Sequence, residues 1–151
     1  MVWLVVLIIV VLAVGGFVWW RVANRKRAMR IFLLRSRQLS DHIVQRMLVA
    51  LKWETPEPLA GTPVADVWGH GIMAFEYAAP TPDFGVSRKL LDHELAQLAA
   101  DENIVSSDPR FPAFVVSDFW IRSGEVHFDV AFVTNAATIE YVEDVERVNQ
   151  E

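Results

Sequence analysis

The chain has 151 residues, no cysteine and a formal net charge of −5. Without cysteine, disulfide bonds, thiolate metal sites and cysteine nucleophiles are excluded. The charge is divided unevenly: residues 1–37 hold seven basic and no acidic side chains, whereas residues 38–151 hold seven basic and nineteen acidic ones, a net of −12. Because phosphates would repel so acidic a region, we expect no nucleic acid as a partner.

Residues 2–20 form an uncharged run, VWLVVLIIVVLAVGGFVWW. A helix of this length spans about 28 Å, close to the thickness of one bilayer hydrocarbon core. Trp3 lies at one end and Trp19 and Trp20 at the other, where interfacial aromatic side chains are typical. A core helix of a small domain would instead show a polar stripe. We therefore predict that residues 1–20 are a single transmembrane helix.

A basic collar follows this run, and no basic side chain precedes it. Its members are Arg21, Arg25, Lys26, Arg27, Arg30, Arg35 and Arg37. Positive flanks stay on the cytoplasmic side, which predicts a single-pass cell-membrane protein with its N-terminus outside and residues 21–151 in the cytoplasm. A cleaved signal peptide would need the basic residues ahead of a shorter apolar run. We expect the lipid bilayer as a partner, with anionic headgroups contacting Arg21, Arg25, Lys26, Arg27 and Arg30.

We interpret residues 21–58 as a basic juxtamembrane helix and a proline-rich linker. An apolar face recurs at helical spacing, formed by Leu39, Ile43, Val44, Met47, Leu48 and Leu51. This face either packs on the protein's own domain or contacts a second copy or another protein. If the helix breaks near Gln38, Ser40 or Asp41 could cap a new start. The linker reads WETPEPLAGTP over residues 53–63, too rich in proline and glycine for a regular element.

Residues 59–151 are predicted to form an α+β domain in the order β-β-α-β-β-α, with an antiparallel sheet and helices on one face. The first strands are expected at 64–68 and 72–78, around a turn at Gly69-His70-Gly71. A helix is expected over 88–100 with Ser87 as its N-cap. A last helix is expected over 136–149, although its β-branched start leaves a short strand as an alternative.

The clearest pattern is a hairpin over residues 113–134, AFVVSDFWIRSGEVHFDVAFVT. A two-residue loop at Ser123-Gly124 pairs Arg122 with Glu125. A shift by one residue would mix polar and apolar side chains on both faces, so the pattern itself selects the register. On one face the expected pairs are Ile121–Val126, Phe119–Phe128, Ser117–Val130 and Val115–Phe132. On the other face they are Trp120–His127, Asp118–Asp129, Val116–Ala131 and Phe114–Val133.

The pair of Asp118 and Asp129, with His127 beside it, is the candidate site. Like charges directly across a ladder are destabilising, so this pair among aromatic and aliphatic neighbours is unusual. Either both carboxylates are hydrated or neutralised by a basic residue, or Asp118, Asp129 and His127 bind a divalent cation or polar ligand. His127 and Asp129 also match the first half of a two-histidine, one-carboxylate iron site, but no histidine follows His127.

The sequence contains no zincin motif, phosphate-binding glycine loop or nucleophile elbow. We predict no cofactor and favour a non-catalytic role, leaving enzymatic activity open. The leading hypothesis is a membrane-anchored binding or scaffolding subunit for a membrane protein, a cytoplasmic protein or a second copy. One alternative is a cation- or small-ligand-binding or enzymatic domain that uses the Asp pair. Another is a subunit of a membrane transport or secretion assembly, by fold-level analogy.

Overall fold

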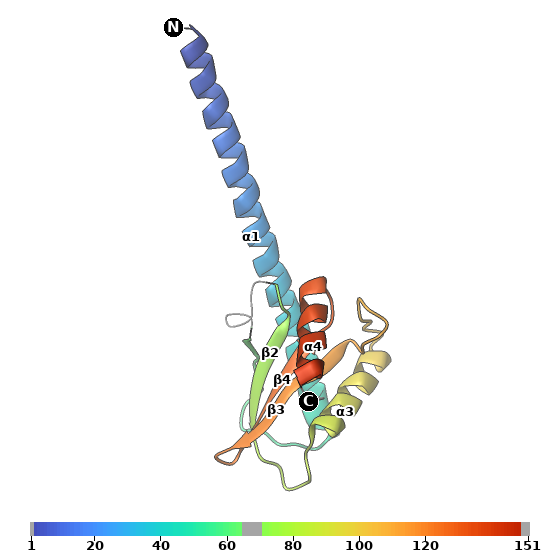
Figure 1. Cartoon of the computed structure of the whole chain (residues 1–151). Helices are drawn as coiled ribbons and strands as arrows, with labels where there is room; N and C mark the ends of the chain where they lie inside the picture. The colour runs from blue at the N-terminus through green and yellow to red at the C-terminus, as the bar shows by residue number, and fades with distance from the viewer. Residues whose placement is uncertain (1, 65–70, 149–151) are drawn as a thin grey trace. The chain divides into compact units, whose positions relative to one another are not determined.

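The computed structural model describes residues 2–64 and 71–148, and it divides the chain into two compact units, residues 1–34 and 35–151. The fold is α+β, with a long apolar N-terminal helix and a small antiparallel sheet domain, as predicted (Figure 1). Its helices are α1 (Val2–Ala50), α3 (Arg88–Asp101) and α4 (Ala136–Val148). Its strands are β1 (Thr62–Pro63), β2 (Ala74–Pro80), β3 (Phe114–Arg122) and β4 (Glu125–Phe132).

The first unit consists of the N-terminal part of α1. Its apolar side chains face outwards from the helix, with Leu7 61% and Leu12 69% exposed. Among the described residues, α1 is the one helix that is long and apolar enough to cross a membrane. This part of the chain is therefore compatible with a single-pass membrane protein.

The C-terminal part of α1 belongs to the second unit, and one face of it is buried there. Ile43, Val44 and Met47 are fully buried, and Leu48 is 1% exposed. The apolar face that we predicted from residue spacing therefore packs on the protein's own domain. The helix continues unbroken to Ala50, so neither of the predicted caps is used. Residues 35–58 are grouped in one compact unit with the domain that we expected from residue 59 onwards.

Asp41 fastens this part of α1 to the sheet. Its Oδ1 accepts hydrogen bonds from the Gly61 backbone N–H and from the Tyr77 hydroxyl, both at 2.8 Å. A Cβ at Gly61 would lie 2.7 Å from Cζ of Tyr77 and 2.8 Å from Cβ of Phe75, so only glycine lets the chain pass this closely. Burial, followed by the nearby Asp41 charge, raises the pKa of Tyr77. This cluster holds α1, the linker and β2 together.

Trp53 extends the same packing beyond the end of α1. Lys52 adopts a left-handed φ of 51°, and the Trp53 N–H donates to the Leu48 carbonyl at 2.8 Å, a Schellman-type helix end. The indole Nε1 donates to the Pro80 carbonyl at 2.7 Å. The indole ring lies 6.1 Å from the Phe128 ring. Trp53, which we had assigned to the linker, is thus part of the core.

The sheet has the order β1-β2-β4-β3, with every pair antiparallel. Asp41 of α1, together with Trp53 just after the helix, covers the face that carries Tyr77 and Phe128. The opposite face packs against α4 in a second cluster, formed by Ile72, Ala74, Val115, Ala131, Val133, Tyr141 and Val142. Our prediction of helices on one face was wrong. At the covered end of β2 the neighbours Ala74 and Phe75 face opposite sides of the sheet, and both are fully buried. This end of the strand is therefore apolar on both faces.

The remaining helix, α3, packs beside the edge strand β3. The Asp92 carboxylate accepts a hydrogen bond from the Val116 N–H at 2.7 Å, which satisfies a backbone donor at the sheet edge. Beyond the helix, Glu102 forms an ion pair with Arg46 of α1 at 2.6 Å. The predicted helix start is confirmed, because the Ser87 hydroxyl accepts from the Leu90 N–H at 3.3 Å.

The predicted hairpin register is confirmed near the turn and wrong beyond it. From Arg122–Glu125 to Asp118–Asp129 the pairs are those expected, and Ser123 and Gly124 take φ of 54° and 82°, as a tight two-residue loop requires. A β-bulge at Ser117 then shifts the ladder. The pairs beyond it are Val116–Val130, Val115–Ala131 and Phe114–Phe132. Counting strict alternation could not reveal an unpaired residue.

Two other predictions concern the ends of the domain. The final helix is confirmed as α4, so its start is helical rather than a short strand. The predicted strand at 64–68 and the turn containing His70 fall largely on residues 65–70, which lie outside the described residues.

We predict that Ile43→Ala lowers the free energy of unfolding of a fragment spanning residues 35–151 by about 2 to 5 kcal/mol. The truncated side chain would leave a cavity in a fully buried position. Urea unfolding followed by tryptophan fluorescence measures the change.

The matched control is Val49→Ala on the same helix, where the side chain is 70% exposed. We expect that substitution to change the free energy by no more than about 0.5 kcal/mol. Equal effects of the two substitutions would contradict the burial of this helix in the domain.

Candidate functional site

Three carboxylates cross the sheet in one row, on the face that α4 partly covers. Glu76 of β2 lies opposite Asp129 of β4, and Asp129 lies opposite Asp118 of β3. Directly opposed residues share a face, so Asp129 stands between two other acids. The Asp118–Asp129 pair was predicted from the hairpin. Glu76 was missed, because the local sequence pattern does not reveal that β2 is the neighbour of β4.

Asp129 is the buried member of the row. It is 7% exposed, and its Oδ1 finds no hydrogen-bond partner among the described residues. Burial raises the pKa of Asp129 to about 7, and the charges of Glu76 and Asp118 add to the rise while His127 opposes it. Asp118 is exposed, and its Oδ1 accepts from the Phe119 N–H at 2.8 Å. The two aspartates that we predicted together therefore stand in different environments.

His127 lies in the next row and contacts carboxylates on both sides. Its Nδ1 is 3.4 Å from Oε1 of Glu76, and its Nε2 is 3.9 Å from Oε2 of Glu125. The imidazole stacks on the Trp120 indole, with ring centroids 5.1 Å apart and planes 8° from parallel. This cross-strand stack fixes the ring next to the row of acids.

The C-terminal helix closes the other side of Asp129. The Tyr141 hydroxyl donates to the Ser117 hydroxyl at 3.1 Å, and the latter donates to the Asp129 carbonyl at 3.5 Å. Burial raises the pKa of Tyr141. The N-terminal end of α4 is anchored by Thr138, whose Oγ1 accepts from the Met73 N–H at 2.9 Å. The bulge residue Ser117 thus connects the helix to the strand that carries Asp129.

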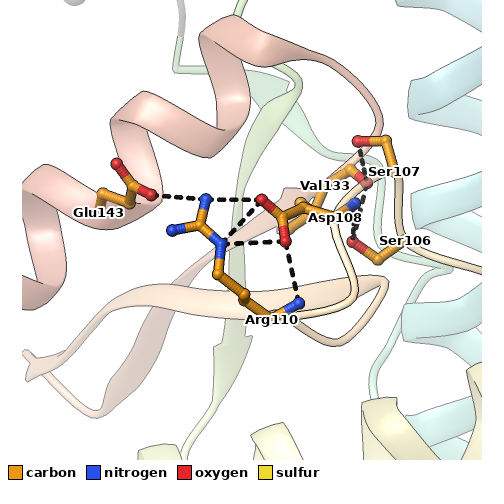
Figure 2. Close-up of polar contacts among 6 residues, drawn as sticks. All are labelled: Ser106, Ser107, Asp108, Arg110, Val133 and Glu143. Atoms are coloured by element: carbon orange, nitrogen blue, oxygen red, sulfur yellow. Dashed lines mark hydrogen bonds and ion pairs between the residues drawn. The ribbon is translucent and has the colours of Figure 1, made fainter.

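A second polar cluster fastens the loop before β3 to α4 (Figure 2). Arg110 Nη2 lies 2.6 Å from Oδ2 of Asp108 and 2.9 Å from Oε1 of Glu143. The Asp108 N–H donates to the Ser106 hydroxyl at 3.1 Å. Hydrogen bonds from Arg110 lower the pKa of Asp108. Since Arg110 is already paired with two carboxylates, we interpret this cluster as a structural clamp.

The predicted cation site of Asp118, Asp129 and His127 is divided between strands β3 and β4. Within residues 2–64 and 71–148, no three His, Asp or Glu side chains are placed to hold a metal ion. Asp118 lies opposite Asp129, whereas His127 lies in the next row opposite Trp120, so the three predicted ligands do not converge on one point. Metal binding by these three residues therefore stays a prediction.

A scan of protein-family models found no match to this chain, and searches of curated proteins and of solved structures found none either. Its function must therefore be argued from its own residues and their arrangement.

The pKa of Asp129 predicts a pH dependence of stability. Because this pKa rises on folding from 3.8 to about 7, the folded state holds its proton more tightly than the unfolded state does. The free energy of unfolding should then fall as the pH rises from about 4 to 7, by up to about 4 kcal/mol from this group alone. Asp129→Asn should remove that component, so the variant should be more stable than the wild type at pH 8 and closer to it at pH 4. Urea unfolding at both pH values measures the difference.

Asp118→Asn provides the matched control. Its carboxylate is exposed, so we expect a gain of less than about 1 kcal/mol from reduced repulsion. An Asp129→Asn variant with the same pH profile as the wild type would mean that this carboxyl ionises freely in the folded state.

Proposed function

We propose that this chain is a single-pass membrane protein whose N-terminus lies outside the cell and whose domain acts in the cytoplasm as a non-catalytic binding or scaffolding subunit. The observation that carries the proposal is the exposed apolar surface of α1. Trp19 is 76% and Trp20 58% exposed at one end of that surface, and Trp3 is 87% exposed at the other. Such a surface is stable in hydrocarbon and unfavourable in water.

The orientation rests on the basic collar. Arg21, Arg25, Lys26, Arg27 and Arg30 are all exposed, directly after the apolar run, and acidic side chains are lacking there. Positive residues next to a span are retained on the cytoplasmic side. In that orientation their side chains can meet the anionic headgroups of the inner leaflet.

The binding role rests on the surface that the packing of the domain leaves open. The apolar face of residues 39–51 could have contacted another protein, but most of it is buried in the domain's own core. Within the described part of the domain, the outward-facing part of the sheet around the row of acids stays open to a partner. A second candidate function, binding of a small polar ligand or cation, is favoured by Oδ1 of Asp129, which has no hydrogen-bond partner among the described residues.

Cysteine accessibility tests the topology, because the chain contains no cysteine of its own. Val105 is 80% exposed in the loop after α3, which makes Val105→Cys a reactive and unobtrusive probe. In intact cells we expect this cysteine to resist a membrane-impermeant maleimide, and we expect it to react after lysis.

A cysteine in a short N-terminal tag is the opposite control and should react in intact cells. Labelling of Val105→Cys before lysis, with the tag protected, would reverse the orientation. A chain recovered in the soluble fraction after carbonate washing would refute the membrane anchor.

A further inference from the structure

The part of the sheet that extends beyond α4 forms an outward-facing surface, which we call the acidic face. The registers place successive cross-strand rows on this side of the sheet. Its side chains are Glu76, Ala78, Asp118, Trp120, Arg122, Glu125, His127 and Asp129. Four of these are carboxylates and one is a guanidinium, so the acidic face attracts cations.

These carboxylates differ in how far the protein satisfies them. Glu76 and Glu125 both lie near the His127 ring, and Asp118 accepts a backbone N–H. Only Asp129 combines burial, at 7% exposure, with an oxygen that has no donor among the described residues. A buried acceptor without a donor is costly, and a ligand that brings N–H donors and positive charge removes that cost.

We infer that the acidic face binds an arginine side chain of a partner protein, with the guanidinium placed between Glu76, Asp129 and Asp118 and beside the Trp120–His127 stack. This inference names the partner chemistry of the proposed binding role, and it rests on that role for the existence of a protein partner. It does not depend on which side of a membrane the domain occupies.

The row of acids suits a guanidinium better than a metal ion. A metal must draw its ligands to within about 2.0 to 2.6 Å, and the described residues offer no such group of three. A guanidinium is planar and presents five N–H donors over a wider area, so it can contact acids that remain on separate strands.

The aromatic stack adds a second source of affinity. Trp120 is half-buried and held nearly parallel to His127, so its orientation is fixed before a ligand arrives. Arginine packs on aromatic rings through cation–π contact, and tryptophan is the best partner for it. An arginine that reaches the row of acids therefore passes next to an aromatic surface.

The test is calorimetric titration of the full chain in a neutral detergent at pH 6.5. The probe is a capped pentapeptide with a single arginine between serine and glycine residues, and the control peptide carries citrulline, which has nearly the same shape without the charge. We expect the arginine peptide to bind at least about tenfold more tightly than the citrulline peptide, and its binding to weaken as salt is raised.

Proton release gives a readout that depends on the site itself. The groups facing Asp129 are Glu76 from β2, Asp118 from β3, His127 from β4 and Tyr141 from α4. A bound guanidinium favours the ionised form of Asp129, so binding at pH 6.5 should release protons. Titrations in buffers of different ionisation enthalpy measure this release.

Asp129→Asn should weaken binding of the arginine peptide about tenfold or more and should abolish the proton release. Trp120→Leu should weaken binding and keep the proton release. Arg122→Ala should strengthen binding, because it removes the one guanidinium of this surface. Glu54→Gln is the matched control, since Glu54 is exposed next to Trp53, whose ring packs on the opposite face, and it should change nothing.

The inference is overturned if arginine and citrulline peptides bind alike, or if Asp129→Asn binds as the wild type does. It is also overturned if millimolar Ca²⁺ or Mg²⁺ binds with Asp129-dependent proton release while the peptide does not, which would identify a metal site. Self-association that Asp129→Asn abolishes, without peptide binding, would assign the acidic face to a second copy. In each of these cases the cysteine-accessibility result stands, so the anchor and this site can fail separately.

Discussion

The fold of the second unit depends on burying the C-terminal part of α1 against the sheet. The central strands of the sheet are β2 and β4. The face that carries Tyr77 and Phe128 is apolar and must be covered to exclude water. That cover comes from a helix that begins in the apolar N-terminal run, so one continuous element has an exposed apolar part followed by a part with one face buried in the domain. Asp41 makes the docking specific, because its single oxygen receives both the Gly61 N–H and the Tyr77 hydroxyl. Apolar packing supplies the free energy, and these two hydrogen bonds select which way the helix lies on the strands.

A sheet covered on both faces normally excludes charge from its central strands, yet β4 carries Asp129. The reason is that α4 covers only one end of its face. Ala74 and Ala131 pack under the helix, whereas Ala78 and Glu125 further along are exposed. Asp129 falls at the boundary between these regions, close enough to α4 to lose water and close enough to the open region to meet Glu76 and Asp118. This position explains both the burial of Asp129 and the lack of a donor to its Oδ1 among the described residues.

Sequence reasoning succeeded where local rules decide the structure. The two-residue loop at Ser123-Gly124 and the alternation around it fix every pair as far as Asp118–Asp129. Helix α3 could be located from its cap for the same reason. The predictions that failed all depend on tertiary contacts. The bulge at Ser117, the place of Glu76 beside Asp129, and the burial of Asp129 under α4 depend on contacts between segments distant in sequence. Trp53 looked like a linker residue because a proline-rich segment follows it in the sequence. Its indole contacts with Pro80 and Phe128 cannot be read from the sequence.

The bulge at Ser117 connects these observations, because it reconciles two constraints that differ by one residue. The turn fixes the register near Asp118, and at the other end of the ladder α4 packs on Val115 and Ala131. Without the bulge, Phe114 and Val116 would face α4. With it, Val115 takes that position opposite Ala131, and Phe114 stacks on Phe132, with ring centroids 4.8 Å apart. Ser117 can occupy the irregular position because its hydroxyl is hydrogen-bonded to both Tyr141 and the Asp129 carbonyl. The hydrogen bond from Tyr141 of α4 to Ser117 therefore also links the helix to the Asp129 backbone, and Asp129 is buried where the helix packs on the sheet.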